Sequence, residues 1–512
     1  MSKAIGALII PLIYMVVVLV LGHGKWTKSL RLNIDDFYKV SAGAAFPLVF
    51  LGLAGGYHSS FAIPGSMGFV YSHGIGWIAN GLWTLFVAGG VMMWLAPRIN
   101  YLARKNNYLT PGDLVAEYFD NSDGVRIATA IATISFSVGY MFTNVIGPAI
   151  LISTLTNNLV TYDVACFVII LVVASYVWRA GIRGTMWTTV LQACWMFVVV
   201  YVAAAYCTTL VGGIKPMMAA MKEHYIEYLT IPGPKGFLTN VTWFSWAAIA
   251  IGLGGALKPV TWSFFYSARK PKEAMKIGYT IPFYLAGIYI PVVFIGFAAL
   301  LIVPGLTGVS ADNSFPKLLY DYAPAWFGGL IIAGAMGAGM STLDAETNIS
   351  SCIFISDIYK RYIAPGKDER HYLIAGRWSI VVLAIITYIF THYRFSIVAI
   401  IATLVNAIVA LYAPTVILIL SKGKLLKSIK ITAAGYICGM ITGGALLIYL
   451  NFISKVSNPL GWHYSAWVLA TNVIVMLLVS QFTKGPSVES KQKFEKSIDE
   501  LYIKSAPEEV SL

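Results

Sequence analysis

The stretch that decides the fold is GAMGAGMSTLDAETNISSCIFISDIYKRY, residues 334–362. It lies in a long apolar segment, yet five polar or acidic residues fall within two helical turns: Ser341, Thr342, Asp344, Glu346 and Asn348. Such side chains are costly in lipid or in a dry core unless they are paired or serve a site. The stretch therefore predicts a membrane helix that carries a functional site.

Composition places this helix in a polytopic membrane protein. The chain has 512 residues, of which 58% are hydrophobic and 12% charged, far from an ordinary soluble domain. About 20 apolar residues are needed to cross the bilayer as a helix, and runs too long and regular for barrel strands predict an all-α protein. Thirteen such runs are found, at about 4–22, 45–71, 75–95, 125–157, 161–182, 187–211, 241–267, 277–303, 325–357, 373–392, 395–421, 430–452 and 464–482.

The net charge of +13 is explained by where the basic residues lie. With the N-terminus outside, most of the 36 Lys and Arg residues fall in inner loops and in the C-terminal tail, as the positive-inside rule requires. We therefore expect a multi-pass protein of the cell membrane, with the N-terminus outside and the C-terminus in the cytoplasm. A nucleic-acid partner would require one clustered basic face, and none is expected.

Cysteine usage and spacing argue against an enzyme. The five cysteines (Cys166, Cys194, Cys207, Cys352 and Cys438) all fall in apolar runs, which predicts buried thiols rather than disulfides or a metal site. The chain has no His/Cys/Asp cluster with metal-ligand spacing and no recognisable pair of nucleophile and base.

Two of the apolar runs contain helix breakers. Run 45–71 has Gly55, Gly56 and Pro64, and run 241–267 has the sequence GLGG shortly before Lys258 and Pro259. Glycine and proline are common in membrane helices, but broken helices in corresponding places of two halves indicate a transporter binding site, because freed carbonyl groups can face ions and substrate.

The spacing of the broken runs predicts an internal repeat. They lie five runs apart, and an odd number of spans inverts the second copy relative to the first. The tail is expected to be a solvated end, with a short surface helix as the alternative. The predicted organisation is an N-terminal flanking helix and inner loop (1–44), a first five-helix repeat (45–211), an outer loop (212–240), a second five-helix repeat (241–421), two flanking helices (422–483) and a cytoplasmic tail (484–512).

The polar residues of the opening stretch share one sector of a helix. Ala338, Ser341, Thr342 and Asn348 lie on that sector, and the two acidic residues lie at its edges. Two hydroxyls, together with backbone carbonyls from a broken helix, would make an oxygen cage of the kind that a hard cation such as Na⁺ prefers. A Ser-Thr pair also bonds back to carbonyls of its own helix, so these residues alone leave both interpretations open.

Part of the opening stretch resembles a known family motif. Residues 337–362, GAGMSTLDAETNISSCIFISDIYKRY, resemble the signature helix of the sodium/solute symporter family. That motif has a small residue, then Met or Ala, then a Ser-Ser or Ser-Thr pair, and it closes with Asp-Ile/Leu-Tyr-Lys. The likeness extends in order along nearly the whole chain. Further similar segments are DDFYKVSAG (35–43), PGSMGFVYSHGIGW (64–77), YLTPGDLVAEYF (108–119), GIRGTMWTTVLQACWM (181–196) and ARKPKEAMKIG (268–278).

The resemblance implies a fold, a function and an ion site. The fold would be the inverted five-plus-five, LeuT-like core with flanking helices, and bacterial proline symporters of the family have thirteen spans with the N-terminus outside. The function would be sodium-coupled symport of a small polar organic solute by alternating access, in a monomer, with Na⁺ as coupling ion and no organic cofactor. The implied sodium ligands are the hydroxyls of Ser341 and Thr342, the carbonyl of Ala338, and two carbonyls of run 45–71, namely Gly56 with either Leu53 or Ser59.

Three positions depart from the family pattern. Thr189 replaces an Asp that supports a further sodium site in some members, so a second sodium is not expected. Lys258 stands where many members have Gln, and a lysine within a span is a functional candidate by default. It would either pair with Asp344 or Glu346 or hold the carboxylate of an anionic substrate. The third departure, His58, is either a substrate contact or a neutral histidine that donates to a carbonyl.

The solute is expected near the middle of the membrane, between the two broken runs. The candidate contacts are His58, Ser59, Ser60, Tyr140, Asn144, Lys258 and Trp262. One alternative is a proton-coupled symporter of a small organic anion or amino acid, because burial favours the protonated form of a carboxyl group such as Glu346 or Asp344. Another is a transporter-like solute sensor, against which the short tail argues.

Overall fold

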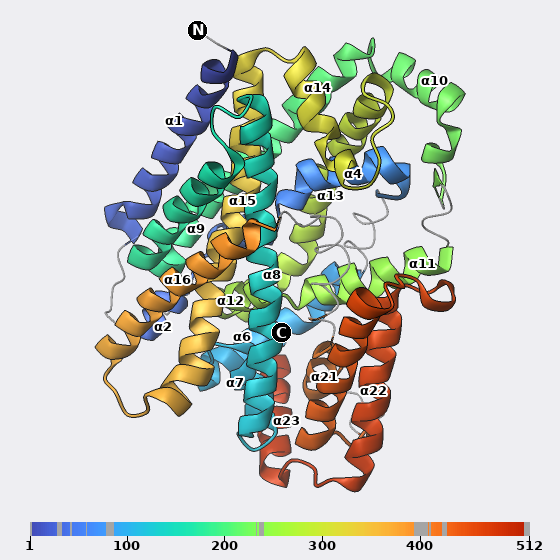
Figure 1. Ribbon diagram of the computed structural model, residues 1–512. Helices are drawn as coiled ribbons and strands as arrows, with labels where there is room; N and C mark the ends of the chain where they lie inside the picture. Colours follow the sequence, from blue (N-terminus) through green and yellow to red (C-terminus); the bar gives the residue numbers. More distant parts are fainter. Residues whose placement is uncertain are drawn as a thin grey trace, which may run out of the picture.

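The fold is known from a computed structural model, which describes residues 3–27, 33–40, 43–57, 59–77, 87–231, 233–234, 240–393, 408, 411–421 and 428–505 (Figure 1). Helices dominate this part of the chain, and its only β-type pairing is an isolated bridge between Ala44 and Ala268. Within it, eight helices are long and apolar enough to cross a membrane, or nine if one bent pair counts as a span. The predicted all-α polytopic class is confirmed.

The long helices define the bundle. They are α1 (Lys3–His23), α8 (Asp123–Leu155), α9 (Tyr162–Leu210), α13 (Pro271–Ile302), α15 continued by η9 (Ala325–Ile363), α16 (Glu369–Thr391), α21 continued by η11 (Ala433–Ile453) and α22 (Tyr464–Phe482). Shorter helices complete it: α2 (Ile34–Tyr38), α3 (Phe46–Tyr57), α4 (Pro64–His73), α6 (Gly89–Asn106), α7 (Pro111–Tyr118), α10 (Ile214–His224), α11 (Asn240–Ser245), α12 (Pro259–Ser267), α14 (Ser314–Tyr322), α19 (Ala413–Leu420) and α23 (Val488–Ser505).

Both runs with helix breakers are interrupted. In the first, α3 ends at Tyr57, the single turn η2 (Ser60–Ala62) follows, and α4 begins at Pro64. In the second, the wide turns of η7 (Trp246–Gly254) precede α12, and the two segments are bent by 41°. Proline at the first position of each following helix lacks the N–H that would continue the previous one. At each break a backbone carbonyl accepts a hydrogen bond from a side chain: Gly55 from Ser341 and Leu257 from Trp262.

The predicted runs 161–182 and 187–211 are two helices that meet within α9. They join without a loop at a kink at Gly181, where φ is +54° and ψ is −141°. Residues with a Cβ rarely adopt this conformation. A Cβ at Gly181 would also lie 2.3 Å from the carbonyl oxygen of Phe37, so the turn depends on glycine.

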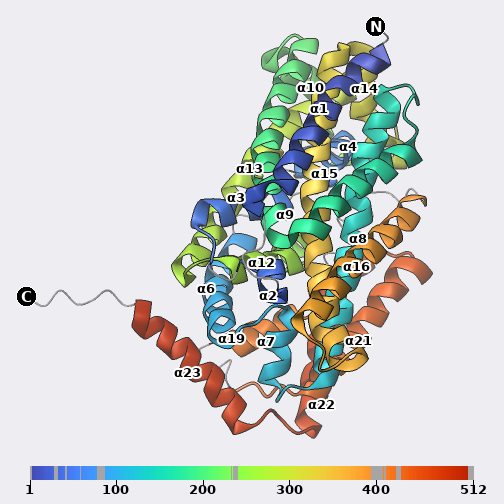
Figure 2. The ribbon, with the colours of Figure 1, turned by 90° about the vertical axis from the view of Figure 1, so that its left-hand side faces the viewer.

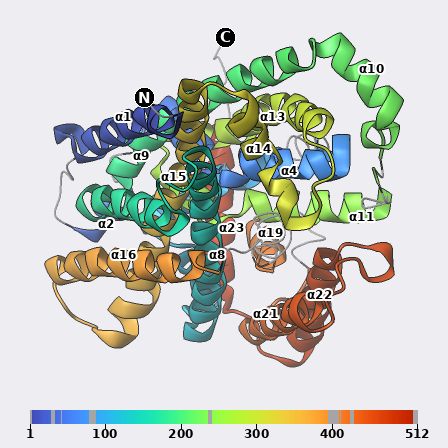
Figure 3. The same cartoon turned by 45° about the horizontal axis from the view of Figure 1, so that its top comes forward.

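The signature helix lies at the centre of the molecule. In Figures 1 and 2, α15 runs through the middle of the bundle, and it packs against α1, α3, α8 and α9. Every residue from Ile331 to Ile353 is buried. Its polar side chains therefore face protein, as a functional site requires. Figure 3 shows α21 and α22, which pack on each other, at the edge of the bundle.

The C-terminal tail is more ordered than predicted. It forms the helix α23 instead of a solvated end, because Phe494 and Ile498 recur on one face and pack inward, with 1% and 3% of their surface exposed. Figure 2 shows α23 beside the ends of α6 and α7, its neighbours in the fold. Glu500 accepts hydrogen bonds from Lys105 at 2.7 Å and from Tyr101 at 2.8 Å.

Two of the five cysteines are less buried than predicted. All five thiols are free, but Cys194 is exposed and Cys438 is partly exposed. An apolar run has one side that faces the lipid, and a cysteine on that side is exposed on the isolated chain. Parts of the runs 75–95 and 395–421 lie outside the described residues.

Candidate functional site

The hydroxyl pair of α15 meets the first broken helix. Ser341 Oγ donates to the carbonyl oxygen of Gly55 on α3 at 2.9 Å, and it lies 3.1 Å from the carbonyl oxygen of Ala338. Thr342 Oγ1 lies 3.3 Å from the same Ala338 oxygen. Each hydroxyl thus lies within bonding distance of a carbonyl of its own helix, and Ser341 also contacts α3. The sodium cage stays a prediction.

Two glycines allow this close approach. A Cβ at Gly55 would lie 2.5 Å from Thr189 Cγ2 on α9, and one at Gly56 would lie 3.3 Å from Ala345 Cβ and 3.6 Å from the Ser341 carbonyl oxygen. The predicted carbonyl donors Leu53, Gly56 and Ser59 are buried in the same segment. The printed contacts bring together the two hydroxyl oxygens and the carbonyl oxygens of Gly55 and Ala338. All four are uncharged oxygen donors of the kind that Na⁺ prefers.

One face of α8 connects the signature helix with both broken segments. Its positions 137, 140 and 144 lie one above another on the helix. Ser137 Oγ donates to Glu346 on α15 at 2.6 Å. Tyr140 OH accepts from Lys258 Nζ at 2.8 Å. Asn144 Oδ1 accepts from the backbone N–H of Ser60 at 2.6 Å. This polar stripe, Ser137–Tyr140–Asn144, holds the predicted substrate region together.

Lys258 is buried at the second break, with 4% of its surface exposed. Its ammonium lies 4.3 Å from the ring centroid of Tyr57 and 4.5 Å from that of Tyr140, where the ring faces attract a desolvated cation. Within the described chain it has no carboxylate oxygen within 4.0 Å. Its ammonium thus contacts two aromatic faces and one hydroxyl, and Glu346 is the acidic group that acts on it electrostatically.

Glu346 is the acidic group on the side of Lys258. It is fully buried, and its Oε2 accepts from Ser137, whereas its Oε1 has no hydrogen-bond partner among the residues described. Ser137 and Tyr140 lie one helical turn apart on the same face of α8, so Glu346 and Lys258, which bond to them, lie on the same side of that helix. The two groups interact electrostatically, but within the described residues no nitrogen–oxygen distance between them is 4.0 Å or less.

Asp344 points the other way. Its Oδ2 accepts from Tyr176 OH at 2.6 Å and from Thr188 Oγ1 at 3.0 Å, and Thr189 Oγ1 lies 3.5 Å from its Oδ1. All three partners belong to α9. At the contact between α9 and α15, the carboxylate is therefore Asp344 of α15. It lies beside Thr189, the residue that replaces the Asp of the family pattern. Of the two acidic residues, only Glu346 is placed on the Lys258 side.

The remaining candidate contacts differ in their surroundings. Ser60 Oγ donates to the Thr143 carbonyl at 2.6 Å, so that residue anchors η2 on α8. Trp262 is buried, and its indole N–H donates at 3.2 Å to the carbonyl of Leu257, in the break before α12. Trp262 thus satisfies a backbone group that the break leaves free. His58 lies outside the described residues.

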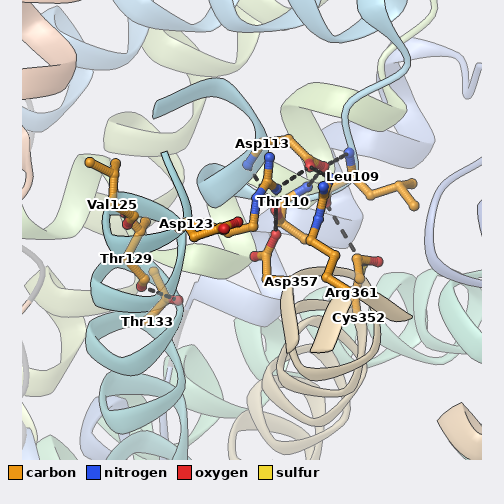
Figure 4. A network of polar contacts seen from close by, with 12 residues as sticks. Leu109, Thr110, Asp113, Asp123, Val125, Thr129, Thr133, Cys352, Asp357 and Arg361 are labelled. Carbon is orange, nitrogen blue, oxygen red and sulfur yellow. Dashed lines mark hydrogen bonds and ion pairs between the residues drawn. The ribbon is translucent and has the colours of Figure 1, made fainter. Parts of the chain in front are cut away.

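A second polar cluster lies at the opposite end of α8 from Asn144 and was not expected as a unit. Figure 4 shows Thr110, Asp113 and Asp357 gathered in one network. Arg126 Nη1 binds Asp113 at 2.6 Å and Asp357 at 2.9 Å, and Thr110 donates to Asp357 at 3.0 Å. Arg126 and Asp357 are almost completely buried. We call this set, Thr110, Asp113, Arg126 and Asp357, the buried charge network.

The buried charge network joins two segments that the sequence singled out separately. Thr110 and Asp113 belong to YLTPGDLVAEYF, and Asp357 begins the closing part of the signature helix. Tyr266 OH at the end of α12 donates to the Thr110 carbonyl at 2.9 Å, which connects the network to the second broken segment. An arginine in the first turn of an apolar span is the signal that would have indicated it.

Comparison with known proteins gives consistent results. A sequence model described as the Sodium:solute symporter family matches residues 44–443. The uncharacterized symporter YhjB of Bacillus subtilis is 24% identical over 472 residues, which cover 89% of this chain and 93% of the relative. The sodium/proline symporter of Escherichia coli K12 is also 24% identical, over 73% of this chain and 74% of the relative.

Among solved structures, a Na⁺-coupled sialic acid symporter in a substrate-bound, outward-open state matches with a TM-score of 0.75. The alignment covers 94% of this chain and 98% of that one, at 15% sequence identity. The likeness shows a shared fold, and it confirms the predicted LeuT-like architecture.

Proposed function

The chain belongs to the sodium:solute symporter family, and from this premise we propose that it couples the influx of Na⁺ to the uptake of a small polar organic solute across the cell membrane. The observation that carries the proposal is the contact of Ser341 with the Gly55 carbonyl, which joins the signature helix to the broken helix α3. Na⁺ would bind there to the hydroxyls of Ser341 and Thr342 and to the carbonyl of Ala338, with further carbonyls from α3.

This site explains coupling in physical terms. A cation between α15 and α3 attracts oxygen atoms of both helices, so its binding favours the arrangement in which they are close. Its release removes that attraction and favours their separation. A ligand shifts a conformational equilibrium only by its differential affinity for the two states, and a site divided between two helices provides that difference.

The solute is proposed to lie against the polar stripe of α8, between the two broken segments. Lys258 would hold a carboxylate, and Glu346 would hold an ammonium group through its Oε1, which has no partner among the residues described. A small zwitterion such as an α-amino acid would pair both buried charges at once. This chemistry accounts for the presence of both charges without an ion pair between them.

The orientation in the membrane, the oligomeric state and the repeat boundaries are proposed from the sequence. The N-terminus would lie outside and the C-terminus in the cytoplasm, because Lys and Arg concentrate in the predicted inner loops and in the C-terminal tail. One monomer would be sufficient for transport. The first repeat would occupy 45–211 and the second 241–421, separated by 212–240 and flanked by 1–44, 422–483 and the tail 484–512.

Uptake into vesicles tests the function directly. Purified protein is reconstituted, and accumulation of labelled amino acids, monocarboxylates and sugars is measured with Na⁺ and H⁺ gradients imposed separately. One Na⁺ moving down ~100 mV releases about 2.3 kcal/mol, and a ~10-fold Na⁺ gradient adds about 1.4 kcal/mol. We expect sodium-driven accumulation of a zwitterion, with an upper limit of roughly 500-fold. For a monoanion with one Na⁺, the voltage term cancels and the limit is ~10-fold.

The same assay separates the second candidate, proton-coupled symport. The unpartnered Oε1 of the buried Glu346 is the observation that favours it, since such a carboxyl group is suited to carry a proton. Accumulation that follows the pH gradient and ignores Na⁺ would establish proton coupling and overturn the sodium assignment.

Charge-removing variants test the proposed solute site. Removing one partner of a buried charged contact costs about 2–5 kcal/mol, so K258Q is expected to raise KM for a carboxylate solute by about 30-fold or more. E346Q is expected to raise KM for an amino acid, but to leave a matched carboxylate that lacks the amine nearly unchanged. The measurement is the concentration dependence of initial uptake.

The matched control is S263A on α12, the helix that begins directly after Lys258. Among the described residues, the Ser263 hydroxyl bonds only to the Val260 carbonyl of its own helix. Its KM should stay within about twofold of wild type, since its hydroxyl contacts no charged group. If KM is unchanged in K258Q while transport remains sodium-driven, the assignment of the solute carboxylate is wrong and sodium symport is retained.

A further inference from the structure

A large apolar groove lies on the outside of the bundle, away from the proposed transport site. It has a volume of about 770 Å³ and lies between the first half of α9 and α16, with the end of α1 beside it. Its lining residues are mostly aliphatic and aromatic, with polar groups from only a few positions: His23, Phe167, Ile170, Leu171, Ala174, Ser175, Trp178, Arg179, Trp378, Val381, Ala384, Ile385 and Tyr388.

Ring contacts fix the direction and the length of the groove. Phe167 packs against Tyr388 at 6.0 Å between ring centroids, and the Arg377 guanidinium lies 5.1 Å from the Trp178 ring. The two helices are therefore antiparallel, with an aromatic end and a basic end. The helical rise from Phe167 to Trp178 is about 16 Å, close to half of the ~30 Å hydrocarbon thickness. The groove thus has the length of one leaflet.

The basic end carries positive charge without an acidic partner. Arg179 is exposed and lines the groove, and Arg377 Nε is buried without a hydrogen-bond acceptor. Neither arginine forms an ion pair within the part of the chain that the structure describes. Two carboxylates at this end pair with other cations: Asp36 with Arg183 at 3.0 Å and Glu369 with Lys360 at 3.2 Å.

Two tryptophans mark the level of the headgroups. Trp178 and Trp378 line the basic end of the groove and are 42% and 63% exposed. Tryptophan is enriched where the hydrocarbon meets the headgroups, because its ring is apolar and its N–H is polar. The end of the groove that bears the arginines is therefore placed at a membrane surface.

We propose that this groove is a binding site for one anionic phospholipid. An acyl chain lies along the apolar wall between Phe167 and Ile385, and the phosphate group lies at Arg179 and Arg377. Guanidinium groups bind phosphate oxygens through paired hydrogen bonds, and anionic lipids are enriched in the cytoplasmic leaflet, the side to which the positive-inside rule assigns this end. The site is independent of the proposed solute and sodium sites.

Native mass spectrometry of the full-length protein tests the site, with phosphatidylglycerol and phosphatidylcholine titrated separately. Wild type is expected to retain one phosphatidylglycerol in preference to phosphatidylcholine. Each arginine near the membrane surface contributes about fivefold to anionic-lipid binding, so the double variant R179Q/R377Q should lose about 25-fold in affinity for phosphatidylglycerol. R179K/R377K, which keeps both charges, should retain most of it.

Two further variants keep the test decisive. R370Q removes an exposed arginine at the same end of α16 that neither lines the groove, as Arg179 does, nor lies over the Trp178 ring, as Arg377 does. It should leave the retained lipid in place. A174W fills the groove with an apolar side chain, keeps both arginines, and should displace the lipid. The proposal is overturned if R179Q/R377Q weakens binding no more than R370Q does, or if A174W retains phosphatidylglycerol like wild type.

Discussion

Replacing both hydroxyls of the signature pair, in S341A/T342A, is expected to abolish sodium-driven accumulation. The variant removes two of the proposed oxygen ligands and the hydrogen bond from α15 to the Gly55 carbonyl. Each lost polar contact in a buried site costs about 1–2 kcal/mol, so apparent sodium affinity should fall by roughly 30-fold or more. The sodium dependence of initial uptake in reconstituted vesicles measures it.

A control on the same helix separates ion binding from folding. T347A also removes a buried hydroxyl, but this hydroxyl bonds only to the Leu343 carbonyl of α15 at 2.6 Å. Its sodium dependence should stay close to wild type. The sodium site is misassigned if S341A/T342A folds normally, judged by its melting temperature, and keeps its sodium dependence within about threefold.

The second large effect is expected on stability, from R126M. Arg126 is the cation between Asp113 and Asp357 in the buried charge network. Removing one partner of a buried ion pair destabilises by about 3–5 kcal/mol, because it leaves a buried charge uncompensated. We therefore expect a strong decrease in the melting temperature of the detergent-solubilised protein.

An exposed arginine at the same carboxylate provides the comparison. Arg361 lies 3.7 Å from Asp113, but its side chain is 43% exposed, whereas that of Arg126 is 2% exposed. R361M should therefore cost less than about 1 kcal/mol. Adding D357N to R126M removes one of the two stranded charges and should recover part of the stability. Equal losses in R126M and R361M would show that burial does not determine the strength of this network.

Much of the fold was predictable because a bilayer leaves the backbone few choices. Apolar runs of about 20 residues must be helices, and glycine and proline near Lys258 predicted the break that the structure has before α12. The motif around Ser341 and Thr342 was specific enough to indicate the family. The prediction for the tail failed because helical packing rather than hydropathy decides its structure: it packs as α23 through Phe494 and Ile498.

The sequence by itself thus determined the class, the family and the helix that carries the proposed sodium ligands, since these depend on composition and on local spacing. Only the tertiary structure decided which acidic residue faces which partner: Asp344 bonds to α9, and Glu346 bonds to α8 beside Lys258. These two acids are neighbours in sequence, separated by one residue. A helix turns by about 200° over two positions, so their surroundings depend on which helices pack on each side, and local sequence does not contain that information.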